Sequence, residues 1–465
     1  MAEPGMEFQL ILGLALAIFV LIFLVVKTKV HAVVALVIAA SIAGLIGGMM
    51  PSDIVNSITT GFGRTLSTIG LVIGFGVMMG RVLEVSGAAE KMAYSLIRWL
   101  GEKKEEWALV ITGYIVSIPI FCDSAFVILT PLVKALARSS GKSILTMGIC
   151  LAGGLMLTHH AVPPTPGPLG VAGIYGVDIG LMIFWGVVFT VPGMFVIVAY
   201  ARRMGPRIEK MIETDTGEDI GAAYRAFKAA ADERDRELPP LGRSIAPLVV
   251  PIALIFLNTL ATFVVKASDD PALAQSFLVQ TASFIGNPVI AVGIGLLLAV
   301  YTLLPNVPRN DAISYMEQGV ESAGIILLVT GAGGALGAVL RDSGAGDVIG
   351  ASVAELPIPV ILIPFVISTL VRLIQGSGTV AMITGASISA PILTAIPDVN
   401  MVFAAQAAAI GSMAFSYFND SYFWVINRML GVRYAKHQML VWSVPTTLGW
   451  ATALTMLIIC NALFG

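Results

Sequence analysis

Five ionisable side chains lie deep within apolar stretches of the sequence, and their types could do chemistry there: Asp123, His159, His160, Arg372 and Asp420. A charged group inside a lipid bilayer is costly, so such residues are functional candidates by default. Carboxyl groups and imidazoles can take up and release protons. We therefore expect Asp123, Asp420 or the adjacent His159 and His160 to carry a coupling proton. Arg372 is expected either to bind a substrate carboxylate or to form a structural ion pair.

Neutral hydrogen-bonding groups accompany these charges at four places that demand irregular backbone: Pro119–Ser124, Thr158–Pro168, Gln375–Thr379 and Ser416–Ser421. Such backbone is tolerated at membrane depth only inside protein or along a watery cavity. Helix N-termini beside the breaks offer amides and positive dipole ends to an anion. The predicted substrate-binding residues are Asp123, Ser124, Thr158, His159, Thr165, Arg372, Ser377, Gly378, Thr379, Asn419, Asp420 and Ser421. Each of these hydroxyl groups could instead hydrogen-bond a backbone amide or carbonyl that the break leaves without a helical partner.

The composition requires that membrane spans position these residues. The chain has 465 residues, of which 57% are hydrophobic and 12% charged, and its mean hydropathy is +0.90. Soluble domains are about 25% charged. The three cysteines lie in apolar segments and suggest neither disulfides nor a zinc site. The sequence has no metalloprotease helix, phosphate loop or nucleotide fingerprint. We expect no catalytic residue, no metal, no cofactor and no nucleic-acid partner.

Apolar runs predict an all-α membrane protein with about ten crossings. They cover residues 8–26, 32–50, 66–85, 143–177, 181–200, 245–265, 282–304, 321–340, 399–430 and 440–463, and the runs 143–177 and 399–430 are predicted to be broken helices. Two further stretches, 107–137 and 358–396, are too long for one simple span. Basic residues flank the first stretch on both sides, and mostly acidic residues flank the second. We predict an inner and an outer re-entrant hairpin, with two tight spans or one tilted span as alternatives for each.

Charge sorting orients this arrangement, because Lys and Arg gather on the cytoplasmic side of membrane proteins. With two hairpins, 22 of the 27 Lys and Arg are cytoplasmic and three are external, while Arg81 and Arg372 fall within membrane segments. Both termini are then external, in a multi-pass protein of a bacterial inner membrane. The polar insert 202–243 is predicted to be a cytoplasmic, partly helical linker between residues 1–201 and 244–465.

An internal repeat supports two related halves. Residues Gly74–Gly76, Gly80 and Ser86–Ala88 recur at an offset of 257 as Gly331–Gly333, Gly337 and Ser343–Ala345. A repeat unit with an odd number of crossings enters the membrane upside down the second time. Inverted repeats are typical of transporters, whose substrate and coupling ion bind where the halves meet. The glycines themselves are better explained by close helix packing than by ligand contacts.

The motifs resemble those of the gluconate permease family of sugar-acid and proton symporters, within the wider ion transporter superfamily. The matching pieces span both halves: Phe121–Pro131, Thr158–His159, Pro163–Pro168, Arg372, Gly376–Ala381 and Ser416–Trp424. The resemblance implies proton-coupled uptake of gluconate-like acids, a homodimer and an elevator motion. The gluconate-type pattern has glutamate, glycine and histidine where this chain has Asp123, His160 and Thr165. Other members carry D-serine or short hydroxy acids, so those substrates stay open here.

The expected function is therefore proton-coupled import of a small hydroxy or sugar carboxylate by alternating access. The alternative coupling ion is Na⁺, because carbonyl and hydroxyl oxygens at the tips could bind it. A channel needs a continuous pore lined by rings of ligands, which opposed broken helices do not suggest. An intramembrane aspartyl protease is excluded because no Tyr-Asp pair accompanies Gly344–Asp347.

Overall fold

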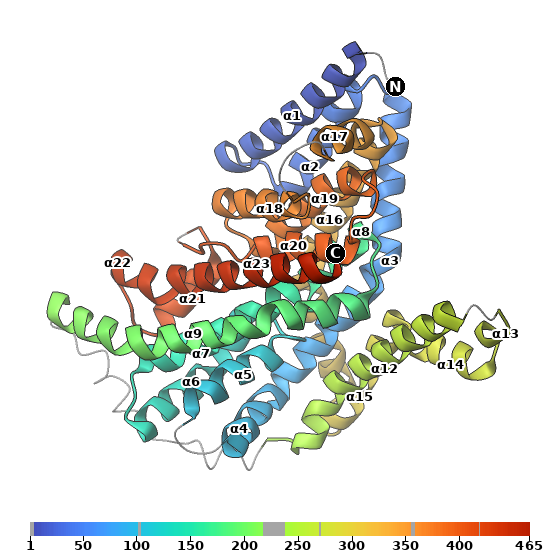
Figure 1. Cartoon of the computed structure of the whole chain (residues 1–465). Helices are drawn as coiled ribbons and strands as arrows, with labels where there is room; N and C mark the ends of the chain where they lie inside the picture. Colours follow the sequence, from blue (N-terminus) through green and yellow to red (C-terminus); the bar gives the residue numbers. More distant parts are fainter. Residues whose placement is uncertain (1–3, 101–103, 217–237, 269–270, 355–358, 418) are drawn as a thin grey trace.

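The computed structural model describes residues 4–100, 104–216, 238–268, 271–354, 359–417 and 419–465. Within those ranges every regular element is helical, which confirms the all-α class (Figure 1). The polar middle of the predicted linker, residues 217–237, lies outside the described residues.

The first half begins with α1 (Pro4–Lys27), α2 (Ala32–Ile46), α3 (Pro51–Val85) and α4 (Ala88–Leu100). Pro51 occupies the first turn of α3, where its missing N–H has no helical partner to lose. The helix therefore starts at Pro51 rather than at Leu66, the start of the predicted span. Many residues in its first turns are polar, so hydropathy alone did not place them in the predicted span. In the structure these residues belong to the same continuous helix. Gly87 ends the connection to α4 with a φ of +75°.

The stretch predicted as the inner hairpin forms α5 (Glu105–Val116) and α6 (Cys122–Ser140), joined by a turn. Its two ends lie together: Lys142 Nζ is 2.8 Å from Oε2 of both Glu105 and Glu106. Glu106 is buried, and Arg202 from α9 approaches it at 3.4 Å. The chain therefore enters and leaves this helical hairpin on one side.

The first broken run forms α7 (Ile144–Ala161) and α8 (Pro166–Tyr175), and α9 (Ile179–Thr216) follows. Every residue of α7 is buried, so this helix lies at the centre of the protein. The break falls at residues 162–165, inside the proline cluster. The helix α9 continues through the predicted linker boundary at residue 202 to Thr216.

The second half begins with α12 (Leu241–Ser268), α13 (Pro271–Ala274), α14 (Phe277–Ile285) and α15 (Pro288–Leu303). The sequence predicted one span over 282–304, but α14 and α15 meet at a bend of 62°. Asn287 caps α15 by accepting from Val289 N at 3.0 Å, and Pro288 opens that helix. These four helices project as an arm from the rest of the molecule (Figure 1).

The remaining helices are α16 (Arg309–Asp342), α17 (Ala345–Ala354), α18 (Leu362–Gln375), α19 (Gly378–Thr394), α20 (Met401–Gly411), α21 (Ser421–Met429), α22 (Ala435–Gln438), the π-helical turn η1 (Met439–Ser443) and α23 (Val444–Phe464). The helices α18 and α19 form the second hairpin, and a nonhelical segment separates α20 from α21. The predicted outer hairpin 358–396 is described from residue 359 onward.

Helix packing is reciprocal between the two halves. The long helices α3 and α16 pack along each other; α2 packs on α1 and α16, while α15 packs on α12 and α3. In the same way α1 contacts α17, and α12 contacts α4. The starts of α4 and α17, at Ala88 and Ala345, differ by the repeat offset of 257. In each half, therefore, a helix from the start of that half packs on the long helix of the other half: α2 on α16, and α15 on α3.

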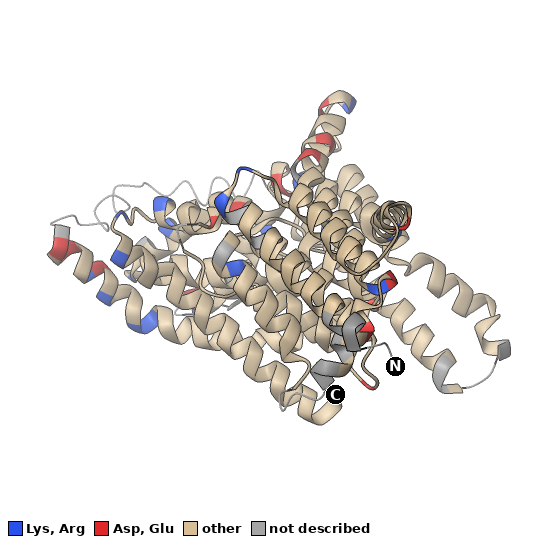
Figure 2. Ribbon diagram, turned by 90° about the horizontal axis from the view of Figure 1, so that it is seen from above, with Lys and Arg blue, Asp and Glu red and all other residues tan. Residues whose placement is uncertain are grey.

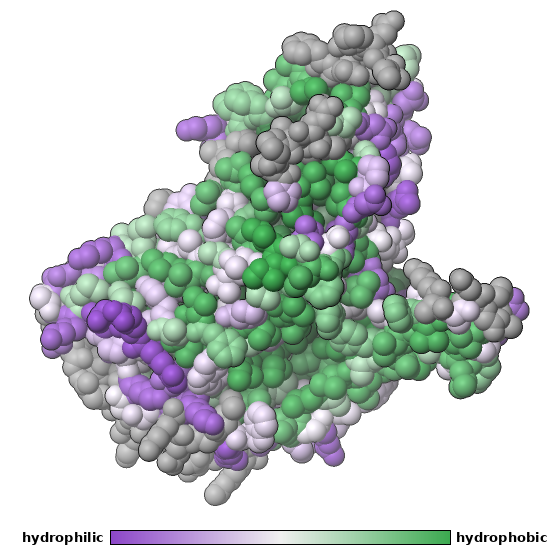
Figure 3. All heavy atoms as spheres, in the orientation of Figure 1, coloured by the Kyte–Doolittle hydropathy of each residue, from purple (hydrophilic) through white to green (hydrophobic). Residues whose placement is uncertain are grey.

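The surface is suited to lipid. Six helices in the described ranges are long and apolar enough to span a membrane, or seven if α14 and α15 count as one bent span. Shorter apolar helices, including α2, α19 and α20, accompany them. Apolar side chains cover the middle of the molecule and the projecting arm (Figure 3). Charged positions are concentrated toward the ends of the molecule and are sparse in its centre (Figure 2).

Candidate functional site

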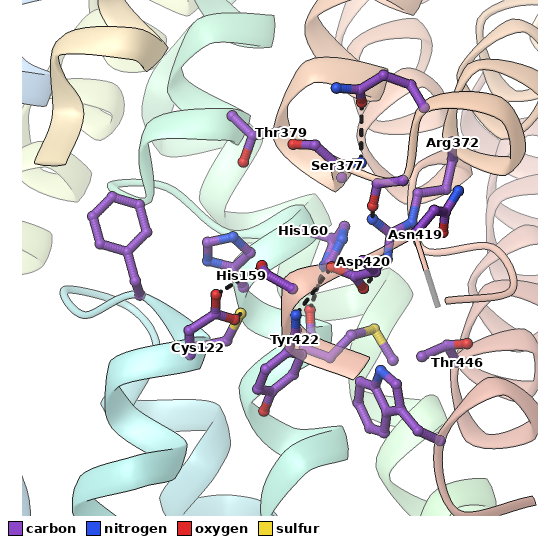
Figure 4. A pocket seen from close by; sticks show the side chains of 18 of the residues that line it. Cys122, His159, His160, Arg372, Ser377, Thr379, Asn419, Asp420, Tyr422 and Thr446 are labelled. Atoms are coloured by element: carbon purple, nitrogen blue, oxygen red, sulfur yellow. Dashed lines mark hydrogen bonds and ion pairs between the residues drawn. The ribbon is translucent and has the colours of Figure 1, made fainter. Parts of the chain in front are cut away.

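A cavity of about 530 Å³ lies where the four irregular segments meet (Figure 4). The inner tip with the start of α6, the end of α7, the outer tip and the segment before α21 all line it, and η1 and α23 contribute one residue each. The lining residues are Phe121, Cys122, Asp123, Ser124, Met156, His159, His160, Arg372, Gln375, Gly376, Ser377, Gly378, Thr379, Asn419, Asp420, Ser421, Tyr422, Trp442 and Thr446. Ligand pockets of a few hundred cubic ångströms bind small molecules.

Most of the residues singled out in the sequence share this cavity. They are Asp123, Ser124, His159, His160, Arg372, Ser377, Gly378, Thr379, Asn419, Asp420 and Ser421. Thr158 and Thr165 are not among the lining residues. Their hydroxyls are both buried and each donates to a backbone carbonyl at 2.7 Å, that of Tyr114 and that of Val162 respectively. Both hydroxyl groups therefore hydrogen-bond the protein backbone, which was the alternative role expected for each hydroxyl from the sequence.

A buried ion pair joins the outer hairpin to the segment before α21. Arg372 Nη2 lies 2.6 Å from Asp420 Oδ2, and both side chains are more than nine-tenths buried. Arg372 also donates to the carbonyl of Gly376, which holds the tip against its own helix. Asp420 caps α21 by accepting from Tyr422 N at 3.2 Å. The pair therefore fixes the relative position of two backbone breaks.

Two consecutive hydrogen bonds connect Asp420 to Trp442 through Ser416. Ser416 donates to Asp420 Oδ2, and Trp442 Nε1 donates to Ser416 Oγ at 3.0 Å. Trp442 is fully buried and lies in η1, the π-helical turn. Turns of this kind inside helices often occur at functional sites. The indole thus connects a distant helix to the ion pair.

Asp123 has a different environment from Asp420. Ser421 Oγ donates to its Oδ2 at 3.0 Å, and the thiol of Cys122 lies 3.6 Å from Oδ1. Among the described residues the structure gives Asp123 no ion-pair partner. Two carboxylates therefore line the cavity, and one arginine neutralises only one of them.

Three helix N-termini converge on the cavity, because α6, α19 and α21 begin at Cys122, Gly378 and Ser421. Each N-terminus carries free amides and a partial positive charge of about half a unit. Ser377 caps α19 by accepting from Val380 N at 3.4 Å, and Gly376 adopts a φ of +89° to make this sharp turn. The backbone therefore complements Arg372 in attracting an anion.

The two histidines at the end of α7 also face the cavity (Figure 4). His160 Nδ1 lies 3.0 Å from the carbonyl of Met156, so this nitrogen carries a hydrogen. His160 Nε2 and His159 Nδ1 are buried without a hydrogen-bond partner in the described structure. Gly378 packs against His160 Nε2 so closely that a side chain at position 378 would collide with the ring.

Comparison with known proteins identifies this arrangement. The sequence matches the family model described as GntP family permease over residues 9–463. The chain belongs to the GntP permease family. This membership confirms the resemblance to gluconate permeases, and it makes the chain a membrane transporter rather than an enzyme. A multi-pass protein of the bacterial inner membrane is supported by the family and by the apolar helices.

Relatives within the GntP family extend over most of the chain. An uncharacterized permease of Haemophilus influenzae is 58% identical over 414 residues, covering 89% of this chain and 84% of that protein. A gluconate permease of Pseudomonas aeruginosa is 32% identical over 377 residues, covering 81% of this chain and 80% of that protein.

A solved structure supports the fold of this GntP-family chain. MtrF of Neisseria gonorrhoeae, from a class of antimetabolite efflux pumps, aligns with a TM-score of 0.63 at 15% identity. The alignment covers 94% of this chain and 96% of that chain. At this identity the likeness shows the fold alone.

Sequence reasoning missed several lining residues of the GntP-family cavity. Phe121, Cys122 and Gln375 lie within the predicted tips, so proximity to a backbone break was the available signal. Tyr422 directly follows the predicted break Ser416–Ser421 and had the same signal, whereas Met156, Trp442 and Thr446 had none. They lie in helices whose apolar sequence is equally typical of a packed core.

Proposed function

We propose that this GntP-family chain imports a small hydroxy or sugar carboxylate together with protons. The observation that carries the proposal is the meeting of Arg372 with three helix N-termini in one cavity. An anion entering there would exchange its hydration for fixed donors, which is how helix ends bind carboxylates. Relatives named gluconate permeases support a carboxylate cargo.

The charges in the cavity support proton coupling. With Arg372 positive and both Asp123 and Asp420 negative, the side chains sum to one negative charge. A bound carboxylate would bring the total to two, which is costly in a poorly solvated site. One proton on a carboxyl group restores the charge of the empty site. Asp123 is the carboxyl proposed to take it, because Arg372 already stabilises the charge of Asp420.

The remaining lining groups suit a hydroxylated ligand. Ser124, Ser377, Thr379, Asn419 and Ser421 present hydroxyl and amide groups around the anion-binding centre. A cavity of about 530 Å³ has room for a six-carbon sugar acid. Shorter acids such as glycerate, and D-serine, are the competing cargoes. A panel of these acids in a thermal-shift assay would rank them.

The transport cycle is proposed to be an elevator-type exchange between two inverted halves. The reciprocal packing of α2 on α16 and of α15 on α3 supports an inverted pair. The two helical hairpins would then be re-entrant, and both termini external. A homodimer is proposed as the working unit, and exposed Phe277, Leu278 and Phe284 on the projecting α14 offer apolar surface for lipid or a second copy.

Uptake into proteoliposomes tests the coupling. With a pH difference that is acidic outside and no Na⁺, we expect labelled gluconate or a related acid to accumulate. Collapse of the gradient with a protonophore should abolish accumulation. Uptake that persists after collapse but requires Na⁺ would establish the sodium-coupled alternative and contradict the proposal.

A variant locates the proton within the same assay. Asp123→Asn should lose gradient-driven accumulation while it retains exchange of labelled for unlabelled substrate, because exchange requires no net proton movement. Asp53→Asn is the matched control, because Asp53 is exposed in the first turn of α3 and outside the cavity. Full concentrative uptake by Asp123→Asn would rule out this carboxyl as the carrier.

A further inference from the structure

A second cavity lies between the long helices and the far ends of α8 and α19. It has a volume of about 320 Å³, and its lining includes Arg64 and Thr68 of α3, Arg341 of α16 and Thr394 of α19. It shares no lining residue with the central cavity. Small residues form much of the wall, and among them Gly61 packs on Ala338 with no room for a side chain.

The two arginines are unusual for where they lie. The predicted topology leaves only three basic residues external, Arg64, Lys266 and Arg341, because basic residues are disfavoured on that side. Two of these three line the same cavity, although 277 positions separate them in sequence. The packing of α3 along α16 brings this pair together.

The charge balance of the cavity favours anions. Among its lining residues Arg64 and Arg341 are the charged ones, and none is acidic. The neighbouring Asp342 has Oδ1 3.5 Å from Arg341 Nε, while its Oδ2 accepts from Ser57 Oγ at 2.7 Å. Two arginines and one carboxylate leave one net positive charge. A cleft with low-dielectric walls focuses such a charge and raises the local concentration of counter-ions.

The helix α19 connects this cavity with the central one. Gly378 and Thr379 at its start line the central cavity, while Ala390, Pro391 and Thr394 near its end line the second. Ala390 lies eleven positions after Thr379 in this helix, a rise of about 17 Å. Because the predicted topology has α19 ending on the external side, the second cavity would lie on the outer side of the substrate site, between α19 and the long helices.

We infer that the second cavity is an external capture site for carboxylate anions, in which Arg64 and Arg341 attract the substrate before it reaches Arg372. The inference rests on the proposed function for the identity of the anion and on the predicted topology for the side. The site holds its ligand weakly, through long-range attraction and exposed arginine contacts. Its effect is on the encounter of the substrate with the transporter, rather than on the translocation step.

Kinetics of uptake test this role. At low ionic strength Arg64→Gln combined with Arg341→Gln should raise KM for the carboxylate about 3- to 10-fold at unchanged kcat, within the range by which steering alters association. The effect should shrink as salt is added, because salt screens exposed charges. Asp342→Asn should change KM in the opposite direction. Arg64→Lys with Arg341→Lys should retain the wild-type KM.

Lys266→Gln is the matched control, because the predicted topology makes this charge external too, and no described residue of α12 lines either cavity. Equal KM values for the double glutamine variant and the wild type at low salt would overturn the inference. That result would leave carboxylate transport itself intact. Absence of carboxylate uptake by the wild type would instead contradict the proposed function.

Thiol labelling supplies a readout that does not depend on transport. In Thr394→Cys, which keeps both arginines, an anionic methanethiosulfonate reagent applied to whole cells should react faster than a cationic reagent of similar size, each rate being taken relative to that with a free thiol. Adding Arg64→Gln should reduce this preference. The native Cys150 and Cys460 are buried, and labelling of Cys122, which lines the central cavity, is measured in the wild type and subtracted. Preference for the cationic reagent, or labelling only from the cytoplasmic side, would refute an external anion site.

Discussion

At the scale of single residues, the pairing of Arg372 with Asp420 raises a question about its purpose. Each side chain is more than nine-tenths buried, and removal of one partner from such a pair leaves an uncompensated charge that costs about 3–5 kcal/mol. A loss of transport in a single variant could therefore report damage to the fold or loss of a substrate contact. Removing both charges separates these effects.

We expect Arg372→Gln to lower both Tm and carboxylate affinity. Combined with Asp420→Asn, it should recover much of the Tm, because no unpaired charge remains. The affinity should stay about 10- to 100-fold below that of the wild type, as loss of a charge-assisted contact worth about 1.5–3 kcal/mol implies. Thermal-shift titration of purified protein with gluconate and related acids measures both quantities. Recovery of affinity in the double variant would assign Arg372 a structural role alone.

The charged residues of the central cavity were predictable from the sequence, but the neutral residues around them were less predictable. Asp123, Arg372 and Asp420 were identified in the sequence because a charge within an apolar run is rare and costly. Thr158 was assigned to the site on its proximity to the proline break, but its hydroxyl satisfies the Tyr114 carbonyl. The direction of a hydroxyl depends on packing between α5 and α7, which no local pattern reveals.

At the scale of elements, the π-helical turn η1 brings a tryptophan to the centre of the molecule. Trp442 follows the apolar residues Met439–Val441, so its sequence context resembles that of a buried core residue. Its role becomes visible only when Ser416, 26 positions earlier, is placed beside it. This long-range contact explains why sequence reasoning did not find it.

Trp442→Phe should weaken substrate affinity about 2- to 10-fold while keeping an aromatic ring at this position. The reason is the loss of one hydrogen bond, worth about 0.5–1.5 kcal/mol, that holds Ser416 toward Asp420. Trp450→Phe is the control: its Nε1 also donates to a hydroxyl, that of Thr369 at 3.0 Å, but neither residue lines the cavity. Equal affinities for both variants in equilibrium binding would argue against a positioning role for Trp442.

Some helix boundaries were also predictable from the sequence, and others were not. The breaks at 162–165 and before α21 were predicted because prolines and clustered polar residues interrupt apolar runs. The long starts of α3 and α16 were not, since helical turns with an exposed polar face resemble loops when judged by hydropathy alone. The bend between α14 and α15 had a local signal in Gly286, Asn287 and Pro288 that the apolar run obscured.

At the scale of the whole molecule, equivalent glycines of the two long helices have different surroundings. Gly80 packs against the carbonyl oxygen of Pro119 at the inner tip and has no room for a side chain. Its repeat partner, Gly337, would accept a Cβ, whose nearest neighbour is the Ser387 carbonyl oxygen at 3.5 Å. In an inverted pair, the opposite conformation would exchange these surroundings and bring the outer tip onto Gly337.

Gly337→Ala should therefore fold and bind substrate normally, yet transport at least several-fold more slowly, because the methyl group obstructs only the opposite conformation. Purified protein examined by thermal shift and proteoliposomes examined by uptake give the two measurements. Gly324→Ala on the same helix, where a Cβ meets open space, should leave both unchanged. A wild-type transport rate for Gly337→Ala would count against the exchange of roles between the halves.

Asp123, the carboxyl group of the central cavity that has no ion-pair partner among the described residues, also bears on the electrical behaviour of the cycle. If Asp123 alone exchanges a proton, the moving site carries one negative charge both when it is empty and deprotonated and when it holds the anion with its proton. The site then carries the same charge when it crosses the membrane empty and when it crosses loaded, so a complete cycle moves no net charge. A voltage across the membrane would leave the final accumulation ratio unchanged, and the pH difference between the two sides alone would set how far the cargo is concentrated.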